Sequence, residues 1–147
     1  MVKPSVDRGP STQMSFQLHE RLAADCFEVT DLAICKVLLM NDARYPWLIL
    51  VPQREALTDL HQIAHSEQAQ VFAEITRVSH ALEQLTSPYK LNVAALGNQV
   101  PQLHIHVIAR NKDDEAWPGP VWGVGTARNY KQSESAAFLT QLKTVLS

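Results

Sequence analysis

Two histidines and a glutamine alternate with apolar residues in the last third of the chain, where Leu103 and Ile105 separate Gln102, His104 and His106. Side chains of a β-strand point to alternate faces, so the three polar groups are expected on one face and the apolar groups in the core. A neutral imidazole has a lone pair that can attack an electrophile, and a protonated neighbour can donate a proton to the leaving group. The spacing therefore favours nucleophilic catalysis on one small anionic group.

The residues just before this pattern favour a phosphate as that anion. Gly97 is followed by Asn98 and Gln99. Backbone N–H groups of such a turn, together with the two side-chain amides, can hold phosphate oxygens. Asn98 also fits a plain hairpin turn, so both roles stay open for it.

A His-x-His pair also occurs on protein surfaces and in metal sites. Metal sites of this kind add a third histidine or a carboxylate at a defined position, and none is evident beside His104 and His106. His61 and His65 are four residues apart but lack the glutamate of an HExxH motif, which favours a solvated helix face. A metal site is therefore less favoured than catalysis, and our preferred prediction has no metal ligands and no cofactor.

The elements that must position these residues follow from hydrophobic periodicity. The best helix is Ser66–Leu85, ended by Ser87-Pro88, and its apolar residues recur every three or four positions. A short helix at Phe16–Ala24, capped by Ser15, and a closing helix around Phe138–Leu146 are also expected. Strands are predicted within Phe27–Met40, with a turn near Asp31 and the second strand at Ile34–Met40, and at Trp47–Val51, Leu91–Leu96 and Val100–Ala109. Strands joined by short turns, with grouped helices, indicate an α+β fold with an antiparallel sheet.

Length and composition set the outer bounds. The chain has 147 residues, enough for one domain, which we place at 16–147 behind an N-terminal tail, 1–15. A net charge of −2 argues against a protein that coats nucleic acid. No apolar stretch is long enough to span a membrane. The two cysteines, Cys26 and Cys35, lack metal-site spacing and fit a reducing cytoplasm.

The catalytic segment resembles the signature of the histidine triad (HIT) superfamily, in which three histidines alternate with apolar residues. The apolar strand Trp47–Pro52 and the segment Leu57–Leu60 are also similar to segments of that family, and the long helix and final strand pair come in the family's order. The resemblance covers residues 16 to about 110. In the extension 111–147, Trp117-Pro118-Gly119 resembles the tryptophan-containing tail of the Hint branch.

The resemblance implies a function and an assembly. The family folds as an α+β unit that forms a homodimer with a continuous sheet. Its middle histidine, here His104, attacks the α-phosphorus of a nucleotide and forms a nucleotidyl-histidine. Its last histidine, here His106, contacts the phosphate and the leaving group. No metal is required for this chemistry.

Two positions depart from the family pattern. Gln102 replaces the first histidine, and glutamine can hydrogen-bond a phosphate oxygen but cannot carry a proton. The galactose-1-phosphate uridylyltransferase branch has a glutamine after its histidines and transfers nucleotides, so hydrolase and transferase both stay open. Glu55 stands where the family often has a histidine.

Other residues are further candidates for binding the substrate. Asn41 lies where the family often has an acidic ribose ligand, and it also fits a simple turn residue. Leu39 is a candidate for the base pocket or for the core. Arg110 could steer an anion, although an arginine that ends a strand is usually solvated. Trp117 and Trp122 could cover a ligand, line a dimer interface or anchor their loop.

Three functions follow, in order of preference. The first is an enzyme that acts on nucleoside phosphates or phosphoramidates through His104. The second is a nucleotide-binding module with little catalysis, because the first triad position is Gln102. The third is a metal site built on His104 and His106.

Overall fold

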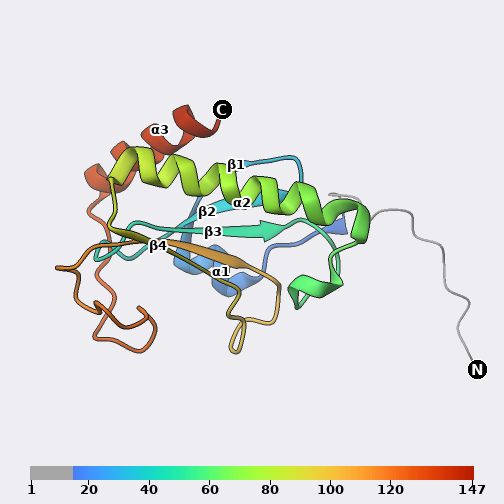
Figure 1. Ribbon diagram of the computed structural model, residues 1–147, viewed down its shortest axis with the longest axis horizontal. Coiled ribbons are helices and arrows are strands. Elements are labelled where there is room, and N and C mark those ends of the chain that lie inside the picture. Colours follow the sequence, from blue (N-terminus) through green and yellow to red (C-terminus); the bar gives the residue numbers. More distant parts are fainter. Residues whose placement is uncertain (1–14) are drawn as a thin grey trace, which may run out of the picture.

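The computed structural model describes residues 15–147, so the predicted tail lies outside the described residues except for Ser15. Within these residues the chain forms a five-stranded sheet with three α-helices and a 3₁₀ turn at Leu60–Gln62 (Figure 1). In chain order the elements are α1 (Glu20–Asp25), β1 (Cys26–Asp31), β2 (Cys35–Met40), β3 (Trp47–Pro52), η2 (Leu60–Gln62), α2 (His65–Thr86), β4 (Lys90–Ala94), β5 (Ile105–Arg110) and α3 (Gln132–Leu146). The predicted α+β class, with a long helix and a closing helix, is confirmed.

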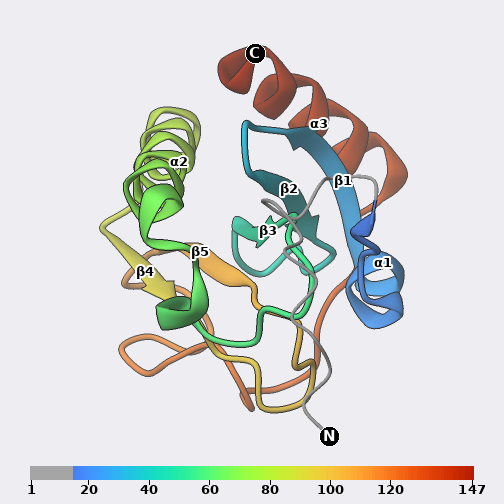
Figure 2. The same cartoon turned by 90° about the vertical axis from the view of Figure 1, so that its right-hand side faces the viewer.

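The sheet is antiparallel throughout, with the strand order β1-β2-β3-β5-β4. Helices α2 and α3 cover one face, and Figure 2 shows both on the same side of the sheet. The apolar stripe of α2 packs there with Leu103, Ile105 and Val107, as the alternation predicts. The opposite face carries a second core, which α1 and the C-terminal extension cover through Leu22 and Val121.

The predicted starts of the first helix and of the last strand are wrong, for physical reasons. The first helix starts at Glu20 and not at Phe16, because the ring of His19 caps it by accepting from the backbone N–H of Arg21. The last strand starts at Ile105 and not at Val100. The backbone N–H of Leu103 bonds to the carbonyl of Leu57 in a loop, so this stretch does not join the sheet ladder.

The long helix starts one residue earlier than predicted and is not capped by Ser66. It starts at His65 after Ala64, which makes no side-chain cap. Its end is as expected, since Ser87 adopts the left-handed conformation and Pro88 cannot continue the helix. Within residues 15–147 there is no helix with the length and apolar character that a bilayer crossing would need.

Arg110 is neither solvated nor free to steer an anion. Its side chain is 1% exposed and forms two hydrogen bonds to the carboxylate of Asp114, at 2.8 and 3.0 Å. It also donates to Asn92 and stacks near the rings of Tyr45 and Trp117. This buried pair ties the end of β5 to the C-terminal extension.

Candidate active site

The two motif histidines line one cavity of about 390 Å³ on the sheet face opposite α2. Its walls come from α1, from the central strands β2, β3 and β5, from the loop after β4 and from the C-terminal extension. The lining residues are Arg21, Leu22, Asp25, Met40, Ile49, Leu96, Asn98, Gln99, Val100, His104, His106, Trp122 and Gly123. Exposed and buried residues both contribute, so the cavity opens to solvent above a floor of buried side chains.

His104 has one ring nitrogen committed and one free. Its Nδ1 lies 2.7 Å from the carbonyl oxygen of Gln102, which only accepts hydrogen bonds. The neutral ring therefore carries its proton on Nδ1 and keeps its lone pair on Nε2. The ring is 6% exposed and lies 4.8 Å, centre to centre, from the ring of His106. This is the tautomer that a nucleophilic imidazole needs.

His106 has the opposite tautomer. The indole N–H of Trp47 donates to its Nδ1 at 3.0 Å, so the proton of the neutral ring is on Nε2, near the carbonyl of Leu96. Trp122 packs edge-on against the same ring, with centroids 5.0 Å apart. His106 thus presents an N–H and not a lone pair to its surroundings. Sequence analysis missed Trp47 as a partner, although strand alternation places it on the face of the sheet that carries His106.

Burial keeps both rings neutral. It lowers the pKa of His104, against the hydrogen bond to the carbonyl of Gln102, which raises it, and nearby His19 lowers it further. Burial, and then the neighbouring His104, lower the pKa of His106 to about 4. At neutral pH the site therefore holds two uncharged imidazoles, one an acceptor and one a donor.

These low pKa values predict a pH dependence of stability. The unfolded-state pKa of histidine is near 6.5. Between pH 6.5 and about 4, His106 is therefore protonated in the unfolded chain but neutral in the folded protein. The free energy of unfolding should fall through this window as the pH falls, by up to about 1.4 kcal/mol per pH unit for each such histidine. Urea unfolding at several pH values measures the slope.

Two variants identify the source of that slope. His106→Asn is expected to flatten it, whereas His80→Ala, which removes an exposed histidine of α2, should leave it unchanged. A flat free energy of unfolding between pH 6.5 and 4.5 in the wild type would contradict the prediction.

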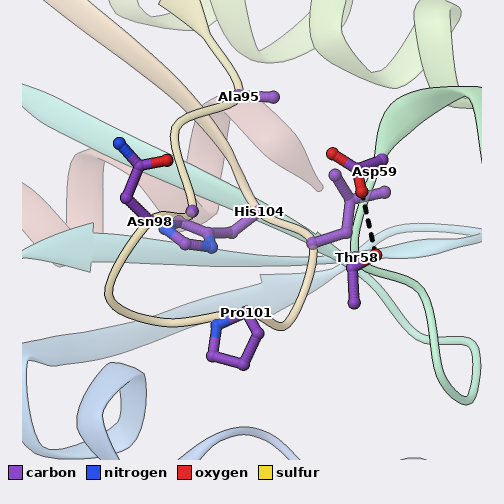
Figure 3. Close-up of a pocket in the computed structure, with 8 residues that line it drawn as sticks. Thr58, Asp59, Ala95, Asn98, Pro101 and His104 are labelled. Atoms are coloured by element: carbon purple, nitrogen blue, oxygen red, sulfur yellow. Dashed lines mark hydrogen bonds between the residues drawn. The ribbon is translucent and has the colours of Figure 1, made fainter.

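A smaller hollow of about 170 Å³ also borders His104 (Figure 3). Thr58 and Asp59 line it from the segment before η2, and Asn98 lines both cavities. Gly97 makes the close packing of this loop possible, because a Cβ there would lie 2.9 Å from the carbonyl oxygen of Val100. Asn98 and Gln99 thus lie where the sequence suggested, beside His104.

Gln102 does not join the two histidines. Its side-chain oxygen accepts from the backbone N–H of His19, and its side-chain nitrogen donates to the carbonyl of Gln17, both at 2.8 Å. The shared face predicted for the three polar groups required a regular strand at Gln102, and β5 starts only at Ile105. The amide instead holds the segment that precedes α1.

Asn41 and Leu39 also lie away from the cavity. Asn41 accepts from the backbone N–H of Tyr130 and so anchors the segment before α3. Leu39 is fully buried in the core beneath α2 and α3. Its neighbour Met40 faces the cavity, because adjacent strand residues point to opposite faces.

The metal site considered from the sequence needs a third ligand beside His104 and His106. Across residues 15–147, no three histidine, cysteine, aspartate or glutamate side chains come together as a metal site would require. His104 and His106 therefore lack a third ligand in the described part of the chain.

Comparison with known proteins identifies the family. The family model of the HIT domain matches residues 21–113, and a comparison with curated proteins gives no match. The chain is similar to the crystal structure of a histidine triad protein from Bradyrhizobium japonicum, with 45% identity, a TM-score of 0.88 and coverage of 90% of this chain and 98% of that one. It is also similar to histidine triad proteins from Sinorhizobium meliloti (41% identity, TM-score 0.89, coverage 92% and 100%) and Marinobacter aquaeolei (43%, 0.86, 89% and 96%). With its paired imidazoles on β5 and the loop that leads into it, the chain belongs to the histidine triad family.

Proposed function

We propose that the protein is a nucleotide hydrolase or nucleotidyl transferase that acts at the α-phosphorus of nucleoside phosphates or phosphoramidates through His104. The observation that carries this proposal is the 2.7 Å hydrogen bond between Nδ1 of His104 and the carbonyl of Gln102. It leaves Nε2 as the lone-pair nitrogen of a buried ring that lines an open cavity. Membership of a family with nucleotide-binding members supports the choice of substrate class.

The reaction has two steps. Nε2 of His104 attacks phosphorus, the Nε2–P bond forms and the bond from phosphorus to the leaving nitrogen or oxygen breaks. Water or an acceptor hydroxyl then attacks the same phosphorus, the Nε2–P bond breaks and releases His104, and the proton of the attacking group passes to solvent. The carbonyl of Gln102 stabilises the positive charge that the substituted ring acquires, and the Nε2–H of His106 can donate to a phosphoryl oxygen.

Proton supply distinguishes this site from a three-histidine site. Gln102 cannot carry a proton, and both imidazoles are neutral near pH 7. The leaving group therefore takes its proton from solvent at the open side of the cavity. Without a protonated side chain at the leaving group, the site suits substrates whose leaving groups depart easily. The same lack of an acid favours the alternative function, a nucleotide-binding module with little catalysis.

The test is to trap the intermediate. Wild type and His104→Ala are mixed briefly with adenosine or guanosine phosphoramidate and quenched with acid, and the mass of each intact protein is measured by mass spectrometry. Product formation is followed in the same tube. A nucleotidyl adduct on the wild type alone is expected. Turnover without an adduct at any quench time, or an adduct on His104→Ala, would contradict the proposal. Nucleotide binding without adduct or product would favour the binding module.

We further propose a homodimer, formed at the outer edge of the sheet. Strand β4 is one of the two edge strands of the sheet, and a groove of about 620 Å³ runs between it and α2. Three large apolar side chains are exposed on or beside this groove: Phe72 at 69%, Val93 at 50% and Leu60 at 45%. Monomeric proteins rarely expose such an apolar patch beside an unpaired strand edge. Pairing of the β4 strands of two subunits would cover both the patch and the edge.

Phe72→Glu is expected to convert the dimer into a monomer, because it would bury a charge in an apolar interface. Light scattering coupled to size exclusion measures the mass. Gln84→Glu adds the same charge on an exposed position of α2 and should leave the dimer intact. A monomeric wild type would contradict the assembly.

The free cysteines Cys26 and Cys35 fit a reducing cytoplasm as the site of action.

A further inference from the structure

The cavity at His104 contains one fixed positive charge among the described residues that line it. The two histidines are neutral near pH 7, and the remaining charged residues of the lining are Arg21 and Asp25. A phosphate brings one or two negative charges into this space. Arg21 is therefore the side chain that can offset them.

Arg21 already reaches toward the loop 97–99 that precedes His104. Its Nη1 lies 3.4 Å from the side-chain oxygen of Gln99, next to Asn98. Among residues 15–147 no carboxylate lies within ion-pair distance of this guanidinium. In contrast, Arg44, Arg54 and Arg110 are each paired with a carboxylate. A guanidinium that bonds an amide oxygen and keeps other N–H groups for a ligand suits a phosphate, whose oxygens match its planar fork.

A chain of hydrogen bonds from the motif holds Arg21 in place. The amide of Gln102 binds both the carbonyl of Gln17 and the N–H of His19. The ring of His19 then accepts from the backbone N–H of Arg21 and starts α1. Residues more than 80 positions apart in sequence are thus tied together at the entrance to β5.

From these contacts we propose that Arg21 binds the phosphate of the substrate and that Gln102 is a positioning residue for it. The ligand class is a phosphate monoester or polyphosphate, and the proposal rests on the proposed function only in placing that phosphate beside His104. In a three-histidine motif this position would hold an imidazole ring. Here Gln102 instead holds the segment before α1, and that helix places Arg21 beside the cavity. The side chain of Gln102 acts through Arg21 and not by contact with the substrate.

The experiment follows the ring signals of His104 and His106 by NMR during titration with three probes: adenosine 5′-monophosphate, pyrophosphate and adenosine. Arg21→Ala should weaken binding of the two phosphate compounds about tenfold or more, the effect of losing a charged hydrogen bond. Adenosine, which has no phosphate, should bind within twofold of its wild-type affinity. Arg21→Lys should keep part of the phosphate affinity, since it keeps the charge and loses the fork.

The matched control is Arg77→Ala, which removes the same charge from α2, where Arg77 bonds to the carbonyl of Leu146. It should leave all three affinities unchanged. Equal affinity for the monophosphate in Arg21→Ala and wild type, or no response of the wild-type rings to either phosphate compound, would overturn the proposal. Phosphate binding that depends on Arg21 in a protein that forms no adduct at His104 would instead defeat the proposed function and leave this inference standing.

Gln102→His tests the positioning role. It completes the three-histidine pattern yet removes both bonds to the segment before α1, so it should weaken monophosphate binding about tenfold and leave adenosine binding unchanged. In the Arg21→Ala background the same substitution should have little further effect, because the two residues act together. Tighter monophosphate binding in Gln102→His, or equal weakening of adenosine, would contradict a role through Arg21.

Discussion

Turnover of a nucleoside phosphoramidate is expected to fall on the order of 10⁴-fold or more when His104 is replaced by alanine, as when other enzymes lose their nucleophile. The reason is that His104 supplies the only nitrogen lone pair that the two motif imidazoles offer to the cavity. In His106, the Nδ1 lone pair accepts a hydrogen bond from the indole of Trp47, and Nε2 carries the ring proton. The loss should fall on kcat, because the remaining walls of the cavity still bind the nucleotide.

Two further variants separate chemistry from folding. His104→Gln keeps most of the buried volume and should lose as much activity as His104→Ala, with nucleoside monophosphate affinity within a few-fold of wild type. His80→Ala removes an exposed histidine on α2 and should keep full activity. Activity in His104→Gln within tenfold of wild type would show that another group attacks phosphorus.

Asp114→Ala is expected to destabilise the fold by about 3–5 kcal/mol, the cost of leaving a buried charge without its partner. Arg110 is 1% exposed, and Asp114 provides both oxygens that neutralise it. Burial alone would raise the pKa of Asp114, but hydrogen bonds from Arg110 and from the backbone of Asn111 and Trp117 hold it below its usual value. A loss of this size is a large part of the free energy that holds a small domain folded. Urea unfolding at pH 7 measures it.

The matched control is Asp113→Ala, which removes the neighbouring, exposed carboxylate and should change stability by less than about 0.5 kcal/mol. Combining Asp114→Ala with Arg110→Met should recover most of the loss, since the double variant buries no unpaired charge. A cost below about 1 kcal/mol for Asp114→Ala alone would mean that Arg110 finds another partner or reaches solvent.

Features that depend on local periodicity were predictable from the sequence. Alternation along β5 correctly predicted that Ile105 and Val107 face the helices, and the three-and-four spacing of apolar residues correctly predicted α2 and its buried side. Together with the order of the elements, these patterns were enough for the α+β class. The motif also identified His104 and His106 as the candidate chemical groups. Each of these inferences depends on residues within a few positions of one another.

The tautomers, the charge of the site and the partners of its residues depended on contacts that no local pattern contains. Trp47 fixes the proton of His106 from 59 positions away, and Gln102 bonds His19 across 83 positions. Arg21 lines the cavity from α1, whose start is bonded through His19 to Gln102, and Arg110 is buried where the extension folds back with Asp114. Periodicity determines which face a side chain occupies, but a hydrogen bond depends on which distant segment covers that face. The sequence therefore determined the fold class and the two imidazoles, whereas only the tertiary structure decided which ring nitrogen is free and which arginine lies beside it.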